Sequence, residues 1–124
     1  MKPLHLILDT SAVLAYASGS EHVGEPISQV LENGAAFTVP LTVLATAAAA
    51  VGDNWVELLT SHPAFEPIQT GWSRWPAVAE MIRVVGRLDA AEALLAAVDF
   101  HCDVLTAEAS LYSALGDDPP VIVI

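Results

Sequence analysis

The sequence contains one cysteine, four basic residues and no apolar run long enough to span a bilayer. Cys102 has no partner for an internal disulfide, which fits a reducing cytoplasm, where a lone cysteine is most often a small buried hydrophobe. The most apolar stretches are interrupted by Thr46, Glu92 and Asp99, so we expect no membrane-spanning segment. The first residues carry no targeting pattern, and we therefore expect a soluble cytoplasmic protein.

Positive charge is scarce. Four Lys and Arg against fifteen Asp and Glu give a formal net charge of −11. Phosphate contacts supply much of the affinity of nucleic-acid-binding proteins, which usually carry a basic patch. The charge therefore disfavours RNA as a ligand and favours metal ions, small molecules or a basic protein partner. Arg83 and Arg87 are four residues apart, and we expect them to share a helix face with Glu80 rather than to clamp a phosphate.

An alternation of strands and helices fills the 124 residues, which fits one domain over residues 1–124. We expect strands over 4–8, 36–39, 65–69, 103–106 and 121–124, of which the third has the weakest pattern. We expect helices over 12–18, 26–31, 42–51, 55–60, 72–85, 89–100 and 108–115. Strands separated by helices indicate βαβ units with right-handed crossovers. The sequence therefore predicts an α/β fold, a three-layer α/β/α sandwich with a parallel sheet of four or five strands.

Asp9 is the most informative polar residue because it directly follows the apolar strand at residues 4–8. An interior parallel strand reads as a continuous apolar run, and open α/β sheets bind ligands at the carboxyl ends of their strands. A carboxylate at this position is therefore a candidate ligand-binding group. The same aspartate could instead cap the helix that follows it.

Three segments give the chain a resemblance to a known family. They are residues 6–14 (LILDTSAVL), 91–97 (AEALLAA) and 104–108 (VLTAE), in that order. In order and spacing they resemble the motifs of PIN-domain ribonucleases and, by size, the VapC-type toxins of toxin–antitoxin pairs. The resemblance covers nearly the whole chain. It implies the strand order 3-2-1-4-5, in which the first and fourth strands are neighbours where the topology reverses.

The resemblance also implies a metal-dependent endoribonuclease site. Asp9, Glu92 and Glu108 would hold Mg²⁺ or Mn²⁺, and Thr106 or Thr10 would orient a water molecule. Hard divalent cations prefer such oxygen ligands, and the metal would activate water and neutralise charge on the phosphoryl group. The family further implies a homodimer and a cognate antitoxin whose basic tail covers the acidic site, which suits the net charge.

The sequence departs from the family pattern at three of four acidic positions. The helix after the second strand has no acid, and Thr46 stands where the family has a glutamate. Glu92 and Glu108 stand where aspartates are usual. Asp89 competes with Glu92 for the third position, and we favour Glu92 because the alanine pattern after it fits better. These departures predict weak or undetectable nuclease activity.

Each acid also has a purely structural interpretation. Asp89 is a good N-cap for the helix over 89–100, and Glu92, three residues later, would then close a capping box with Asp89. Glu108 lies in the first turn of a helix, where the helix dipole favours an acid. The alternative function is accordingly a PIN-fold protein without catalysis that binds a protein partner. Trp72 and Trp75 are expected in the core or in a dimer interface.

Overall fold

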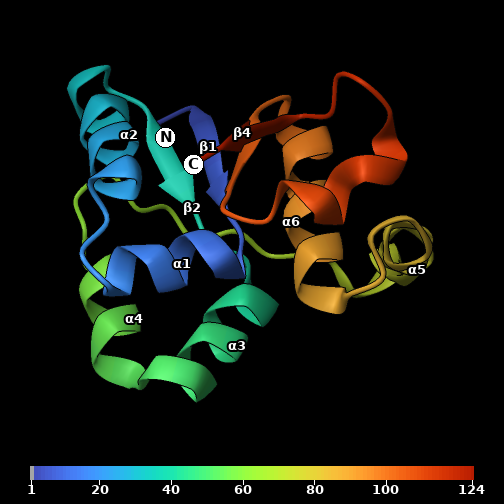
Figure 1. The fold of residues 1–124 in the computed structure, drawn as a ribbon, viewed down its shortest axis with the longest axis horizontal. Coiled ribbons are helices and arrows are strands. Elements are labelled where there is room, and N and C mark those ends of the chain that lie inside the picture. The colour runs from blue at the N-terminus through green and yellow to red at the C-terminus, as the bar shows by residue number, and fades with distance from the viewer. Residues whose placement is uncertain (1) are drawn as a thin grey trace.

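A parallel sheet runs through the middle of the computed structural model, which describes residues 2–124 (Figure 1). The described chain forms four strands, β1 (Leu4–Leu8), β2 (Ala36–Thr38), β3 (Asp103–Thr106) and β4 (Val121–Val123), in the order β2-β1-β3-β4. Each neighbouring pair is parallel, with Leu6 opposite Asp103 and Val104 opposite Val121. The expected α/β class and all-parallel sheet are confirmed.

The segment over 65–69 is not a strand, although one was expected there. Phe65 makes only an isolated parallel bridge with Phe37 of β2. Pro67 lies in the middle of this segment and has no amide hydrogen to donate to a ladder. The observed order of four strands therefore differs from the five-stranded order 3-2-1-4-5, and β2 is an edge strand of the described sheet.

The helices are α1 (Thr10–Ala17), α2 (Glu21–Glu32), α3 (Leu41–Val51), α4 (Asp53–Thr60), α5 (Trp75–Val85) and α6 (Leu88–Phe100), with 3₁₀ turns η1 (Trp72–Arg74) and η2 (Ala109–Leu115). Helix α2 packs against β1 and β2, whereas α6 packs against β1 and β3 and carries α5 on its outer side. Figure 1 shows the sheet between these two groups, an arrangement compatible with a three-layer sandwich. Helices α3 and α4 lie beyond the arrowheads of β1 and β2.

Two helical segments differ from the expectation. Helix α2 begins at Glu21, so Pro26 lies inside it rather than at its start. Val23, Ile27 and Val30 form a buried stripe that begins before the proline, and their burial outweighs the hydrogen bond that proline cannot make. The segment expected as a helix from residue 108 is the 3₁₀ helix η2 instead.

The core is centred on β1, β3 and the alanine-rich face of α6. The middle residues of both strands are fully buried, and α6 buries seven apolar residues: Ala90, Ala91, Ala93, Leu94, Leu95, Ala96 and Ala97. Small side chains allow the helix to approach the sheet closely. Trp72 and Trp75 are 88% and 64% exposed, so of the two places expected for them the core is wrong, and the dimer interface stays a prediction. None of the described helices has the length and apolar character needed to cross a bilayer.

Phe37 of β2 is the largest buried apolar side chain at the sheet edge, and its replacement tests the packing of the segment after α4. Its ring contacts Phe65 edge to face, with ring centroids 5.7 Å apart. Phe37→Ala should lower the free energy of unfolding by about 3–5 kcal/mol. Phe100→Ala, at a 46% exposed position, is the matched control and should cost far less. Urea unfolding measures both, and equal losses would contradict the packing described here.

Candidate functional site

The carboxyl ends of β1 and β3 lie side by side in the middle of the sheet. The two strands pair from Leu6 to Leu8, and the Asp9 amide extends the pairing by donating to the carbonyl oxygen of Leu105 at 3.3 Å. The next residue of β3 is Thr106. From this central pair the sheet continues to β2 on one side and to β4 on the other. Such a reversal of strand order is where open α/β sheets bind their ligands.

The Asp9 side chain is 1% exposed and accepts three hydrogen bonds. One carboxylate oxygen accepts from the Ala12 amide (3.1 Å) and the Ser11 hydroxyl (2.7 Å), so Asp9 caps α1. The other accepts from the hydroxyl of Tyr112 in η2 (2.8 Å). Burial, together with the nearby Asp9 charge, raises the pKa of Tyr112 well above its usual range. The tyrosine therefore keeps its proton and remains a donor to Asp9.

Hydroxyl groups connect Asp9 to the end of β3. Ser11 Oγ lies 3.2 Å from Thr106 Oγ1 and accepts a hydrogen bond from the Ala107 amide at 2.8 Å. Since Ser11 gives its only proton to Asp9, the Thr106 hydroxyl must be the donor in their contact. Thr106 in turn accepts from the Glu108 amide (2.9 Å). Its proton is thus already used within the protein, which leaves none to donate to a water molecule.

Asp89 lies at the start of α6 and is 7% exposed. Its carboxylate accepts from the Thr10 hydroxyl at 2.6 Å and from two nitrogens of Arg87 at 3.1 and 2.7 Å. Burial raises the pKa of this carboxyl, but the hydrogen bonds from Arg87 and Thr10 and the Arg87 charge outweigh burial and hold the pKa below its ordinary value. The expectation that Asp89 caps α6 is wrong, because Arg87 occupies the cap position and Asp89 follows within the helix.

Glu92 binds at the start of α3. Its carboxylate accepts from the Thr42 amide (3.1 Å) and from the Thr42 hydroxyl (3.0 Å). Thr42 is the second residue of α3, where a backbone amide has no acceptor within the helix, and a carboxylate there also suits the helix dipole. The expected capping box within α6 is not formed. Thr46 lies one turn further along α3, is exposed and donates its hydroxyl to the Thr42 carbonyl oxygen (2.6 Å).

Arg87 is the residue of this region that sequence reasoning missed. It was expected on one helix face with Arg83 and Glu80, but Gly86 ends α5 in the left-handed conformation (φ 81°) and places Arg87 at the start of α6. Arg83 does bind Glu80, at 2.7 Å. Arg87 instead binds Asp89 and lies 3.6 Å from a carboxylate oxygen of the half-exposed Glu108. Gly86, which directly follows the helical run, was the signal that could have located this break.

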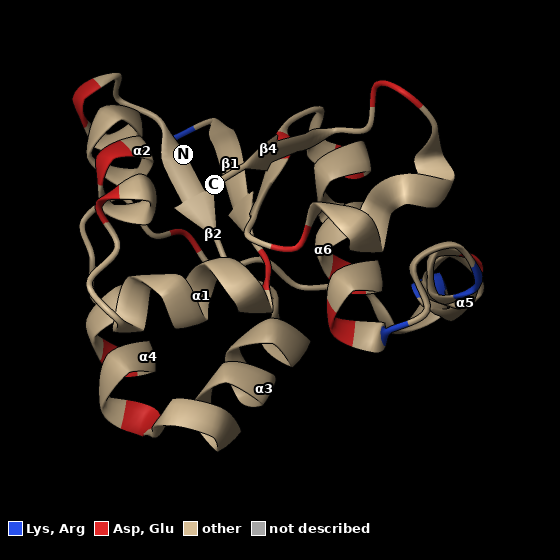
Figure 2. Ribbon diagram, in the orientation of Figure 1, with Lys and Arg blue, Asp and Glu red and all other residues tan. Residues whose placement is uncertain are grey.

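The charge around Arg87 is strongly negative. The hydrogen bond to Asp89 contributes most to raising the pKa of Arg87; burial opposes it, and the charges of Asp89, Glu108 and Asp9 add to it. Figure 2 shows the basic segments gathered at α5 and at its link to α6, with another near the start of β1, while acidic segments are spread over the rest of the fold. Arg87 is therefore the basic residue at this edge of the sheet: it contacts Asp89 and Glu108, and the charge of Asp9 also acts on it.

The side chains as arranged do not fit a divalent cation. Mg²⁺ requires several oxygen ligands in near-octahedral geometry. The Asp9 carboxylate accepts three internal hydrogen bonds, Asp89 is bound by Arg87, and Glu92 is bound at α3. Within residues 2–124 no group of three or more His, Cys, Asp or Glu side chains is placed to hold a metal ion. The fold brings Asp9, Thr106 and Glu108 to one edge of the sheet. Glu92 instead binds Thr42 at the start of α3.

Comparisons with known proteins leave the family open. No protein-family model matches the sequence, and no curated protein matches it. The chemistry of the site has to be argued from its own geometry.

Removal of one donor tests how much the Asp9 carboxylate contributes to stability. Tyr112→Phe leaves a carboxylate oxygen without its tyrosine hydrogen bond in a buried site, and should cost about 1–3 kcal/mol of unfolding free energy. Tyr16→Phe removes a hydroxyl from a half-buried position on α1 and should cost much less. Urea unfolding of both variants gives the comparison. Equal stabilities would mean that the Tyr112 hydroxyl is dispensable.

Acid titration tests the Asp89 carboxylate. Its folded pKa lies below the ordinary value of 3.8, so its contribution to stability is present above about pH 4 and is lost as the pH falls through the folded pKa. Asp89→Asn should therefore be less stable than wild type at neutral pH, and the difference should shrink as the pH falls below about 4. Urea unfolding across this range measures it, with the exposed Asp117→Asn as control. A difference that does not vary with pH would contradict this account.

Proposed function

We propose that the chain is a PIN-like domain of the VapC type whose metal-dependent endoribonuclease activity is weak or absent. The observation that carries the proposal is the hydrogen-bond chain from Asp9 through Ser11 to Thr106. It joins the first and third family-like segments across the ends of β1 and β3, where the resemblance requires them to meet. Glu108 follows two residues later, so three residues of the expected site lie at one edge of the sheet.

Internal contacts of the acids support weak activity. Asp9 accepts three hydrogen bonds and Glu92 is engaged by Thr42, so a Mg²⁺ or Mn²⁺ ion would have to displace existing partners. Thr46 offers a hydroxyl where a glutamate would supply a charged ligand. Loss of a residue that merely hydrogen-bonds to a metal ligand commonly lowers metal affinity by about 10–100-fold, so the loss of a ligand itself should lower it at least as much. The proposal therefore includes no efficient catalytic step at this site.

The distribution of positive charge also argues against tight RNA binding. Arg74 binds Asp99, Arg83 binds Glu80 and Arg87 binds Asp89, each within 3.0 Å. Three of the four basic side chains are thus neutralised by carboxylates of the same chain, and little free positive charge is left for phosphates. A basic protein, such as an antitoxin tail, is a better match for the net charge. The proposal places the protein in the cytoplasm as a homodimer.

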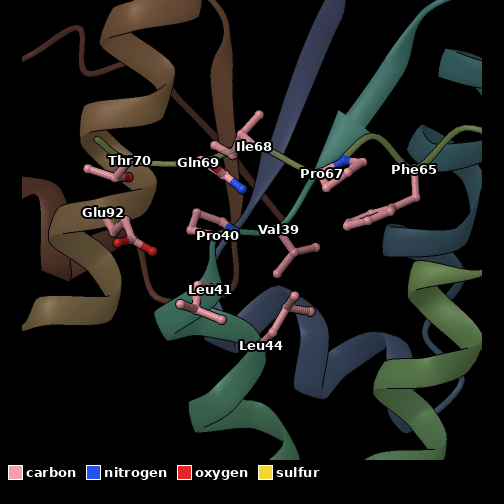
Figure 3. Close-up of a pocket in the computed structure, with 10 residues that line it drawn as sticks. All are labelled: Val39, Pro40, Leu41, Leu44, Phe65, Pro67, Ile68, Gln69, Thr70 and Glu92. Carbon is pink, nitrogen blue, oxygen red and sulfur yellow. The ribbon is translucent and has the colours of Figure 1, made fainter. Parts of the chain in front are cut away.

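An apolar pocket favours a second candidate function, in which the domain binds a protein partner without catalysis. The pocket has a volume of about 480 Å³ and lies between the start of α3, the segment over 65–70 and α6 (Figure 3). Figure 3 shows Glu92 on its α6 wall and Leu41 and Leu44 on its α3 wall. A neighbouring hollow shares Thr70 and Glu92 with it and includes Trp72 and Trp75. Exposed apolar side chains around a concave surface are typical of protein-binding sites.

RNA cleavage in millimolar Mn²⁺ tests the main proposal. Wild type should cleave single-stranded and hairpin RNA at a rate close to that of Asp9→Asn, because its acids are occupied. Thr46→Glu supplies the missing acid on α3 and should raise cleavage by about 10-fold or more. Ala45→Glu, at the adjacent exposed position, is the matched control and should leave the rate unchanged. Circular dichroism verifies that each variant is folded.

Two outcomes would overturn parts of this proposal. Rapid cleavage by wild type that is lost in both Asp9→Asn and Glu108→Gln would show an active nuclease. No difference between Thr46→Glu and Ala45→Glu would mean that α3 does not contribute the missing acidic position. The PIN-like assignment would then lack the second acidic position of the family pattern, and the protein-binding function would remain as the candidate.

A further inference from the structure

We propose that the Arg87 guanidinium takes the place of a metal ion at the carboxyl ends of β1 and β3, holding the acidic side chains together without a divalent cation. The inference rests on the contacts of Arg87 and does not require the chain to be PIN-like. It assigns to an arginine of the chain the structural role that a bound cation has in other acidic sites.

The first argument is the geometry of the contacts. Arg87 binds both carboxylate oxygens of Asp89 through two nitrogens, at 3.1 and 2.7 Å, and a third nitrogen lies 3.6 Å from Glu108. Asp89 belongs to α6, whereas Glu108 follows β3. A single guanidinium therefore joins two segments that leave the same edge of the sheet. Its planar fork suits two-point binding of a carboxylate, and it stays charged at every working pH.

The second argument is that a metal ion and Arg87 would compete for the same oxygens. The Asp89 oxygen that binds Arg87 at 2.7 Å also accepts from Thr10, the residue after Asp9. Asp89 and Glu108 are the two carboxylates in contact with Arg87, and the charge of Asp9 adds to their effect. A divalent ion drawn to these carboxylates would have to displace the guanidinium.

The third argument concerns what remains if Arg87 is removed. The Asp89 side chain is only 9% exposed, and its remaining side-chain partner would be the Thr10 hydroxyl. A buried carboxylate without a cation is strongly unfavourable. The folded protein would then gain stability from any cation that solution can supply. Divalent ions are the natural replacements because they bind oxygen ligands and carry more charge.

Thermal unfolding of Arg87→Gln, with and without metal, tests the proposal. The glutamine keeps much of the side-chain length and removes the charge. In EDTA the midpoint should fall by about 5 °C, and millimolar Mn²⁺ or Mg²⁺ should restore much of that loss. Calorimetric titration should show saturable Mn²⁺ binding to Arg87→Gln, at least about 10-fold tighter than to wild type. Arg83→Gln removes an arginine from an exposed ion pair on α5 and should show no response to metal.

A further variant covers the case in which Arg87→Gln does not fold. Arg87→Lys keeps a positive charge and should fold in EDTA with a midpoint between those of wild type and the neutral variant. Wild type that binds Mn²⁺ as tightly as Arg87→Gln would overturn the proposal. So would Arg87→Lys that is unfolded in EDTA, since charge would then not be what Arg87 supplies. These measurements use no RNA, so their failure is distinguishable from failure of the proposed nuclease ancestry.

Discussion

The buried carboxylate of Asp9 is the interaction on which the arrangement of this edge of the sheet depends. Its oxygens hold the first turn of α1 through the Ala12 amide and hold η2 through the Tyr112 hydroxyl. Through Ser11 the same group is linked to Thr106 at the end of β3. A charged group with so little exposure is tolerated only when it is well supplied with donors. Asp9 has three, and these come from segments at both ends of the chain.

Charge pairing within the chain offsets part of its negative charge. Like charges at high density repel one another and destabilise compact states. Here Arg74 of η1, Arg83 of α5 and Arg87 at the link between α5 and α6 each neutralise a specific carboxylate. Each exposed pair contributes little by itself. The Arg87 contact differs because its partner Asp89 is nearly buried, so its loss has a larger electrostatic effect.

The strand residues of the sheet could be predicted from sequence because buried parallel strands are continuous apolar runs. The runs at β1, β3 and β4 were found with bounds close to those observed, and Asp9 was located at the end of β1. The strand predicted over 65–69 was wrong because Phe65 packs beside Phe37 and makes only an isolated bridge with it, which composition does not reveal. The predicted start of α2 at Pro26 was wrong because burial of Val23 in the folded chain outweighed the local preference of proline for the first turn of a helix.

The site was less predictable than the fold because the partners of its acids come from segments that are distant in sequence and meet only in the folded chain. Glu92 and Asp89 are three residues apart on one helix, yet one binds Thr42 of α3 and the other Arg87. Helical spacing placed both on a similar face and could not separate them. Arg87 was missed for a related reason. A single left-handed glycine redirected the chain, and the arginine changed from a surface residue of one helix to the cation at the start of the next.

The hydrogen bond between Tyr112 and Asp9 spans 103 residues of sequence, and this separation bears on the order in which the domain is made. During synthesis β1 leaves the ribosome well before Tyr112, the donor that completes the hydrogen bonds of its aspartate. The β1–β3 pairing is comparably long in range. Until then Asp9 must remain hydrated, so β1 cannot bury its carboxyl end early. The sheet centre can therefore close fully only after Tyr112 has been synthesised, and shorter nascent chains would leave β1 open to chaperones.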